Sequence, residues 1–347
     1  MRDSGPVAAS DEVRAVVRFR IEPAPPPGEP YLTDAVGTVI VNGPDEIVLA
    51  TRRGRVAIPR RLVVATRIVP PAPPRRGVVG GELAPLELHR EVADSWPPME
   101  RTQLGDWILR ASRGFTSRGN SVVPVGDPGL PLNAALDAVE SWYADRGLPA
   151  NLTLADPRPS TDAAGVLTVD VSRDPVGALL IDRGYAVSDP SLFLTATPAV
   201  VHRSLVGMAR VERGPAGRVT VQADRALTDA WLACYEGYRS NDAEAARAIM
   251  TGSPAQAFAT ALMDGRAVGV GRLGMSGSWG GLAAMWVDPA YRRSGVAQGM
   301  MGELVAAATD LGAQRLHLQV WAHNEPALAL YRRLGFRVHH AYVNATG

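Results

Sequence analysis

The chain contains no lysine, and all 36 of its basic residues are arginines. This absence excludes mechanisms that need a lysine amine, such as a pyridoxal Schiff base or a phosphate-binding loop of the GxxxxGK[ST] type. The single cysteine, Cys234, excludes an internal disulfide framework and a zinc site built from cysteines. Its apolar neighbours favour a small buried side chain over a nucleophile.

Long apolar runs are also absent. No stretch reaches the roughly 18 mainly apolar residues that a membrane-spanning helix needs, and residues 1–12 lack the apolar core of a secretory signal. We therefore expect a cytoplasmic protein that does not contact membranes. Hydrophobic residues still make up 46% of the 347 positions, which is enough for a folded core. This length predicts two to three domains of ~150 residues.

Charge is unevenly distributed along the chain, and the shifts fall near proline-rich breaks. Arginines and acidic residues number 12 and 8 in residues 1–76, 9 and 16 in residues 77–200, and 15 and 11 in residues 201–347. These changes predict three modules, which we place at residues 1–76, 77–205 and 206–347.

The first module has the pattern of a small all-β domain. Five β-prone runs separated by turn residues predict an SH3-like β-barrel, with strands at residues 13–21, 36–41, 47–51, 55–58 and 63–69. A stiff proline-rich linker is expected at residues 69–77.

The first module is also basic, with eight arginines and no acidic residue between positions 47 and 81. Such a patch could contact nucleic acid or another anion. Few aromatic residues lie nearby to stack on bases, so a solvated arginine-rich hairpin is the preferred interpretation and nucleic acid is not an expected partner.

The rest of the chain alternates helical and strand patterns, which predicts the α/β (α+β) class. In the middle module we expect helices at residues 83–96 and 132–146 and strands at 121–125, 151–154 and 192–195. In the third we expect helices at 226–239, 243–250, 296–311 and 325–334, and strands at 258–263, 267–272, 282–287, 316–320 and 337–343.

Residues 285–297 carry the pattern of an anion site, because a strand runs through a short basic loop into a long helix. The unpaired N–H groups and the positive dipole end of a helix N-terminus bind phosphate. Gly295 lets the backbone approach an anion, and Ala297 keeps the wall of the site low. Arg292 and Arg293 can add charge-assisted hydrogen bonds. The segment therefore predicts a pyrophosphate site.

The pattern Arg292-x-x-Gly295-x-Ala297 resembles the R/Q-x-x-G-x-G/A signature of the GNAT superfamily of acyl-CoA N-acyltransferases. Residues 324–336, NEPALALYRRLGF, resemble a second motif of that family. The two motifs occur in the family's order, with a helix and a strand between them. The resemblance implies acetyl-CoA as the acetyl donor and direct transfer to an amine.

The same resemblance implies how the donor is held. Trp286 and Val287 would pair with the pantetheine arm, and Asn324 would help to hold it. Tyr331 would protonate the departing thiolate; this is feasible because a thiol pKa lies near ~8.5 and a phenol pKa near ~10. The pyrophosphate would be held beside Arg292 by the backbone amides of Arg293, Ser294, Gly295, Val296 and Ala297.

The attacking amine must be neutral, so a base or a water chain must remove a proton. Glu236 and Asp288 are the candidates, and the alternatives are a solvated charge for the first and a turn residue for the second. By the same caution, Gly295 and Ala297 could simply begin a helix, and Tyr331 could be a core residue.

The middle module echoes the third. It repeats the order strand, helix, strand, and residues 179–185 resemble residues 330–336. Its counterpart of the phosphate loop carries Asp127 where an arginine would be needed, and Pro128 and Pro131 remove two amide donors. The chain thus resembles actinobacterial GNAT proteins in which tandem GNAT-like mixed sheets flanked by helices follow an SH3-like barrel. We expect one donor site, in the third module.

Two other patterns point away from cofactor chemistry. Residues 269–274 fit GxGxxG, but no helix opens after them, so we interpret them as strand and turn. His339 and His340 are adjacent on a strand and should point to opposite faces, which argues against a shared metal ion. No metal site is expected.

The sequence therefore predicts an acetyl-CoA-dependent N-acetyltransferase that acts on a small-molecule or peptide amine in a ternary complex. The acidic middle module would steer cationic substrates. The alternative is a weakly active or inactive acyl-CoA-binding protein whose barrel binds nucleic acid or protein. Oligomeric state and acyl-chain preference stay open.

Overall fold

The computed structural model describes residues 14–23, 31–51, 54–69, 83–157, 159–161, 166–208, 219–236 and 242–347. The chain divides into two compact units, residues 1–77 and 78–347, and each is described by itself. The expected linker, apart from Val69, lies outside the described residues. So do Arg52 and Arg53, two arginines of the basic stretch between positions 47 and 81.

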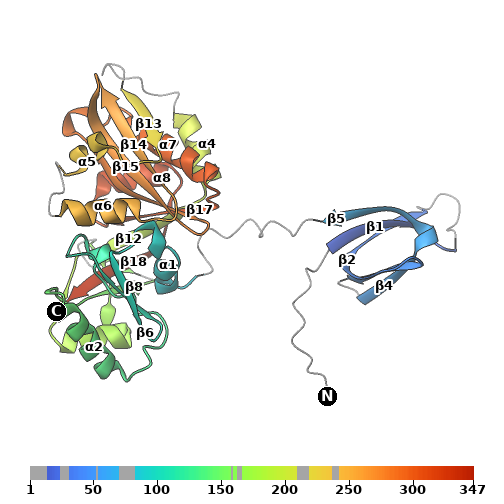
Figure 1. Ribbon diagram of the computed structural model, residues 1–347, viewed down its shortest axis with the longest axis horizontal. Coiled ribbons are helices and arrows are strands. Elements are labelled where there is room, and N and C mark those ends of the chain that lie inside the picture. The colour runs from blue at the N-terminus through green and yellow to red at the C-terminus, as the bar shows by residue number, and fades with distance from the viewer. Residues whose placement is uncertain are drawn as a thin grey trace. The chain divides into compact units, whose positions relative to one another are not determined.

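The first unit is a five-stranded antiparallel sheet in the order β4-β3-β2-β1-β5 (Figure 1). Val17, Leu49 and Ile58 are buried on its inner face. No ladder joins β4 to β5 in the described part of this unit, so closure into an SH3-like barrel stays a prediction. All five expected strands are confirmed, as β1 (Arg14–Arg20), β2 (Leu32–Asn42), β3 (Glu46–Thr51), β4 (Gly54–Pro59) and β5 (Val63–Val69).

The second unit is built on one mixed sheet of nine strands, in the order β11-β18-β12-β17-β16-β15-β14-β13, with β8 also paired to β18. All its ladders are antiparallel except β16 with β17. The strands are β8 (Asn151–Asp156), β11 (Ala186–Val187), β12 (Ser191–Ala196), β13 (Thr220–Asp224), β14 (Gln256–Met263), β15 (Arg266–Ser276), β16 (Trp279–Val287), β17 (Arg315–Trp321) and β18 (Arg337–Thr346).

Helices cover this sheet, and four short strands complete the unit (Figure 1). The short strands are the hairpin β6 (Glu100–Leu104) with β7 (Trp107–Ala111) and the pair β9 (Ser160–Thr161) with β10 (Leu167–Thr168). The helices are α1 (Pro85–Glu91), α2 (Leu132–Ala144), α3 (Pro175–Asp182), α4 (Pro198–Met208), α5 (Asp229–Glu236), α6 (Ala243–Thr251), α7 (Val296–Asp310) and α8 (Glu325–Arg333). The mixed α/β class with helices flanking the sheet is thus confirmed.

Strand β12 lies between β17 and β18, so the expected second and third modules share one sheet. Ser191 pairs with Trp321 on one side and with Tyr342 on the other. The expected boundary after residue 205 stays a prediction.

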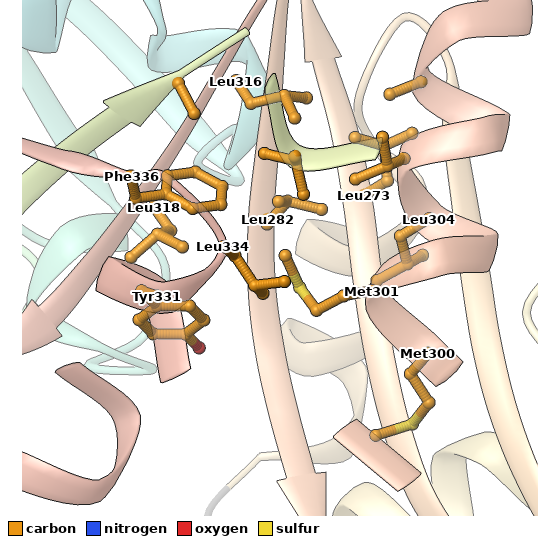
Figure 2. Packing of buried hydrophobic residues seen from close by; sticks show 14 of the residues in the cluster. Leu273, Leu282, Met300, Met301, Leu304, Leu316, Leu318, Tyr331, Leu334 and Phe336 are labelled. Carbon is orange, nitrogen blue, oxygen red and sulfur yellow. The ribbon is translucent and has the colours of Figure 1, made fainter. Parts of the chain in front are cut away.

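The largest core lies between α7 and the sheet, and Figure 2 shows its packing. Met300, Met301 and Leu304 of α7 are fully buried against residues of β15 and β16 such as Leu273 and Leu282. Their spacing gives the helix one apolar face, and burying such side chains stabilises the fold by about 1.5–3 kcal/mol each. This confirms the helix that the sequence predicts from residue 296.

Two expectations in the middle region are wrong in detail. Residues 121–125 form no strand but only isolated bridges, in which Val122 contacts Leu152 and Val123 contacts Ile108. Pro124 lacks an N–H donor, which limits a ladder at this point. The helix expected at residues 83–96 is divided into α1 and the short 3-10 helix η2 (Ala93–Ser95).

A cluster of buried histidines packs around Phe193 in the second unit. The rings of His317 and His340 stack on Phe193 at 5.2 and 4.9 Å, and His89 meets its edge at 5.2 Å. Burial lowers the pKa of His317 and of His340 to about 3, and it holds the pKa of His89 well below its usual value. These side chains are therefore neutral in the folded protein.

His339 and His340 do not point apart, contrary to the sequence expectation, because their Nδ1 atoms lie 2.8 Å from each other. The β12–β18 ladder contains a bulge: Phe193 pairs with His340 while Leu194 pairs with Val338. The extra residue, His339, thereby leaves the regular alternation of faces. Among the described residues, no group of three or more His, Cys, Asp or Glu side chains is arranged so that it could hold a metal ion.

The neutral histidines make stability depend on pH. In the unfolded chain a histidine takes up a proton below about pH 6.5, whereas the buried ones do so only at much lower pH. The contribution of the neutral histidines to the free energy of unfolding is therefore fully present above about pH 6.5 and is lost as the pH falls below it. We expect each buried histidine to contribute a loss of up to about 2 kcal/mol between roughly pH 7 and 5. Urea unfolding at several pH values measures it. His317→Gln should flatten the dependence, whereas replacing the exposed His202 by Gln should not.

Candidate active site

The N-terminus of α7 presents unsatisfied backbone donors. Its cap residue is Gly295, no side chain caps the helix, and the first backbone bond of this turn runs from the Gly299 amide to the Gly295 oxygen at 3.0 Å. The amides that precede Gly299 therefore face the approach to the helix, at the positive end of its dipole. This arrangement binds anions.

The backbone of the preceding loop explains why these residue types occur. Gly295 has φ +86°, a conformation that glycine adopts at low cost, and Arg293 is left-handed at φ +63°. The Ser294 hydroxyl donates to the Tyr291 oxygen at 2.6 Å, which fixes the turn. Arg292 is exposed, and its Nε donates to the Val287 oxygen at 3.1 Å. The predicted loop is thus one folded turn at the helix start.

The parallel strands β16 and β17 part near the middle of the sheet. Their ladder ends at Leu282 and Leu318, although both strands continue. At the same point the β15–β16 ladder shifts register, and Ala284 adopts φ +53°. This bulge bends β16 and leaves one edge of it without a strand partner. An extended ligand arm can pair with such an edge.

A cavity of about 530 Å³ opens where the two strands part. One wall comes from the strand ends and α8: Leu282, Ala283, Ala284, Met285, Gln319, Val320, Trp321, Asn324, Ala327 and Tyr331. The other lining residues come largely from the middle region, and most of them are polar; we call this group the polar wall, and it includes His89, Arg110, Thr116, Ser117, Arg118, Thr153, Ser191, Tyr342 and Asn344.

Tyr331 lies on α8 at the border between this cavity and the α7 core (Figure 2). Its ring packs edge-on against Phe336 at 5.9 Å, and the residue is only 9% exposed. Burial raises the pKa of Tyr331 to about 12, so the phenol stays protonated at neutral pH. A protonated hydroxyl at this position can donate a proton into the cavity.

Asn324 lines the same cavity and also begins α8. Its Oδ1 accepts from the Ala327 amide at 3.3 Å, which is an N-cap bond. The Asn324 side-chain amide group keeps its donors for another partner. The residue thus combines a structural bond with a place at the site.

Three of the other sequence candidates, Trp286, Val287 and Asp288, are not among the residues that line the cavity. Trp286 and Val287 follow directly after Met285 on β16 but do not line the cavity. Asp288 caps the 3-10 helix η5 (Pro289–Tyr291) and pairs with Arg266 at 3.3 Å. Glu236 is the last residue of α5, and its side chain lies outside the described part of the chain. Asp288 is therefore not brought into the cavity, and Glu236 stays an untested candidate.

The GxGxxG pattern at residues 269–274 lies inside β15, which confirms the strand interpretation. Close packing explains why glycine occupies these positions. A Cβ at Gly274 would overlap the backbone oxygen of Ser95, and one at Gly271 would press on Met285 beside the bulge.

Sequence reasoning missed the polar wall of the cavity. Arg110 stands in the run WILRA of β7, whose five residues are all buried. His89 is 4% exposed in α1. The available signal was a charged residue inside an otherwise apolar strand. Such residues are rarely buried unless they are hydrogen-bonded, paired with an opposite charge or part of a functional site.

Known families match both regions that form the cavity. Residues 224–336 match the family described as "Acetyltransferase (GNAT) family". Residues 86–174 match the family described as "Probable histone acetyltransferase Rv0428c C-terminal".

Two curated relatives span most of the chain. The "Uncharacterized N-acetyltransferase YobR" of Bacillus subtilis is 26% identical over 72% of this chain and 93% of its own length. The "Probable histone acetyltransferase Rv0428c" of Mycobacterium tuberculosis is 28% identical over 94% of this chain and 92% of its own length.

A solved structure has a similar fold. The "GCN5-related N-acetyltransferase from Kribbella flavida" superposes with a TM-score of 0.50 at 16% identity, covering 72% of this chain and 89% of that one. Among the described residues, no helix is both long enough and apolar enough to cross a membrane. The region that carries the loop and the parted strands, residues 224–336, thus matches the GNAT acetyltransferase family, and the chain as a whole is similar to proteins named as acetyltransferases.

Proposed function

We propose that the protein transfers an acetyl group from acetyl-CoA to a primary amine in a ternary complex. The observation that carries this proposal is the position of the cavity. It begins at the open edge of β16, beyond the last β16–β17 pair, and includes Tyr331 and Asn324. A donor with its pyrophosphate at the N-terminus of α7 could extend its arm along this edge.

The chain's residues divide the chemistry as follows. The amide groups around Gly295 hold the pyrophosphate, and the free edge at residues 283–285 pairs with the pantetheine arm in place of Trp286 and Val287. The amine attacks the thioester carbonyl, and the C–S bond breaks as the C–N bond forms. Tyr331 gives its proton to the leaving sulfur and regains one from solvent.

His89 is the route by which the amine loses its proton. In the described part of the chain no carboxylate lines the cavity, whereas His89 does. Its Nε2 lies 3.0 Å from His340 Nε2, and His340 Nδ1 lies 2.8 Å from Nδ1 of the half-exposed His339. Burial and nearby cations hold the pKa of His89 low, so the ring is neutral. It can therefore accept a proton from the amine as it hands another on to His340.

Ala297→Glu tests the donor site. A carboxylate in the first turn of α7 suits the helix dipole, so folding should be preserved, but it should repel a pyrophosphate. We expect calorimetry to show acetyl-CoA binding weakened by roughly 10- to 100-fold. Ala306→Glu places the same charge on the exposed side of α7 and is the matched control. Equal binding by both variants would contradict the assigned loop.

Tyr331→Phe tests the proton donor while keeping the packing against Phe336. We expect kcat to fall by about 100-fold or more, with acetyl-CoA affinity unchanged, because only the hydroxyl is lost. The rate of coenzyme A thiol release at saturating substrate measures kcat, and calorimetry measures the affinity for acetyl-CoA. An unchanged kcat would remove Tyr331 from the mechanism.

His89→Gln tests the relay. At neutral pH we expect kcat/KM for the amine to drop by about 10- to 100-fold. The deficit should shrink as the pH approaches the pKa of the acceptor, since the amine then arrives neutral. The control is His202→Gln on the surface of α4, whose pH profile should follow wild type. A deficit that is constant with pH would indicate a structural role.

A further inference from the structure

Arg110 is a buried arginine that the structure holds rigidly at the cavity. It is 2% exposed and lines the polar wall. Its Nε donates to the Ser121 oxygen at 2.9 Å, and its Nη2 donates to the Ser121 hydroxyl at 2.7 Å. That hydroxyl also accepts from Thr153 at 3.1 Å, and Tyr143 donates to the Arg110 backbone oxygen at 2.8 Å. Two of the five guanidinium N–H groups are used, so three remain.

The charge of Arg110 has no counterion in the described part of the chain. Arg110 forms no ion pair there, and no Asp or Glu lines the cavity. Arg118, on the same wall, is a second cation. Burial, with smaller contributions from Arg118 and Arg101, lowers the pKa of Arg110 to about 10, so the group stays charged at neutral pH. A buried charge left in this state is costly.

Arg272 shows how this protein satisfies a buried arginine that has only a structural role. Its guanidinium donates to the backbone oxygens of Met250, Ser95 and Ile249 and to the hydroxyl of Ser253. The Met250 and Ile249 oxygens belong to the last turn of α6, whose dipole favours a cation. Arg110 has no comparable set of carbonyls.

The donor's pyrophosphate is not placed to act as a counterion for Arg110. The loop assigned to the pyrophosphate, residues 293–297, contributes nothing to the wall of this cavity. The space between Tyr331 and Arg110 is instead where the acceptor must lie if the thioester is beside Tyr331. An anion bound by Arg110 therefore belongs to the acceptor.

We propose that the acceptor is an amine that also carries an oxyanion, a carboxylate or a phosphate, and that Arg110 binds this group with Arg118 beside it. The proposal rests on the proposed acetyl transfer. A guanidinium suits either oxyanion because its fork of N–H groups can make two parallel hydrogen bonds. Cationic peptides would be repelled by the same wall. The acceptor's anion would also offset the cations that lower the pKa of His89.

Wild-type protein with matched acceptors gives the first test. The probes are 4-aminobutyrate and longer ω-amino acids, their neutral amides, aminoalkyl phosphates of the same lengths, and an arginine- and lysine-rich peptide. Release of the coenzyme A thiol measures kcat/KM. We expect an anionic acceptor to exceed its neutral match by about 100-fold, with the carboxylate and phosphate arms identifying the group.

Arg110→Gln gives the second test. The ratio of kcat/KM for the best anionic acceptor to that for its neutral match should collapse toward one. Arg110→Lys should restore part of the ratio, because it keeps the charge but not the fork. Arg101→Gln is the control, since Arg101 is the exposed partner of Arg110 in the β6–β7 ladder, and its ratio should equal that of wild type. If Arg110→Gln loses thermal stability, the kcat/KM values of wild-type protein with the matched anionic and neutral acceptors decide whether the proposal holds.

Three results would overturn the proposal: equal use of neutral and anionic acceptors, preference for the cationic peptide, or preference for neutral amines with succinyl-CoA. In the last case the oxyanion would belong to the acyl group. If no amine releases thiol, acetyl transfer fails, and calorimetry with 4-acetamidobutyrate and its neutral amide decides the site alone. Selective binding of the anion by wild type and not by Arg110→Gln would uphold it, and absence of binding would reject it.

Discussion

The site depends on one limit in the sheet, which is that β16 and β17 stop pairing after Leu282 and Leu318. Two parallel strands that part leave unpaired backbone groups in the interior, and such groups must find partners. The bulge at Ala284 directs β16 away from β17, and the cavity fills the gap. A ligand with its own amide groups is the natural partner for the free edge. The core under α7 holds both strands in this parted arrangement.

Charge is placed locally and not according to the net charge of a region. Residues 77–200 carry more acidic residues than arginines, which predicts attraction of cations. Among the described residues of this region, those that line the cavity include Arg110 and Arg118 and no carboxylate. A field inside a cavity is set by the nearest unscreened groups, because solvent screens the exposed acids. The net charge of the region therefore does not describe the charge at the cavity.

Local patterns predicted the elements that carry their own signals. The apolar stripe of α7, the strands β14–β17 and the turn at Gly295 all occur where the sequence indicates them. Contacts between distant residues had no such signal. The insertion of β12 between β17 and β18, the approach of His89 to His340 across 251 positions, and the bulge at His339 depend on tertiary pairing. The strand ends and α8, which line part of the cavity, carry local signals, so the sequence indicated Tyr331 and Asn324. The polar wall is brought to the cavity by tertiary pairing, so the sequence did not indicate Arg110.

The place of β12 also bears on how this architecture can be recombined. Its two neighbours in the sheet, β17 and β18, lie more than a hundred positions later in the chain. A fragment beginning after residue 205 would keep the loop at residues 293–297 but would lack β12. The edges of β17 and β18 that pair with β12 would then expose two rows of backbone donors and acceptors. Exchanging the region after residue 205 for that of a relative would therefore require a strand of matching register in the place of β12.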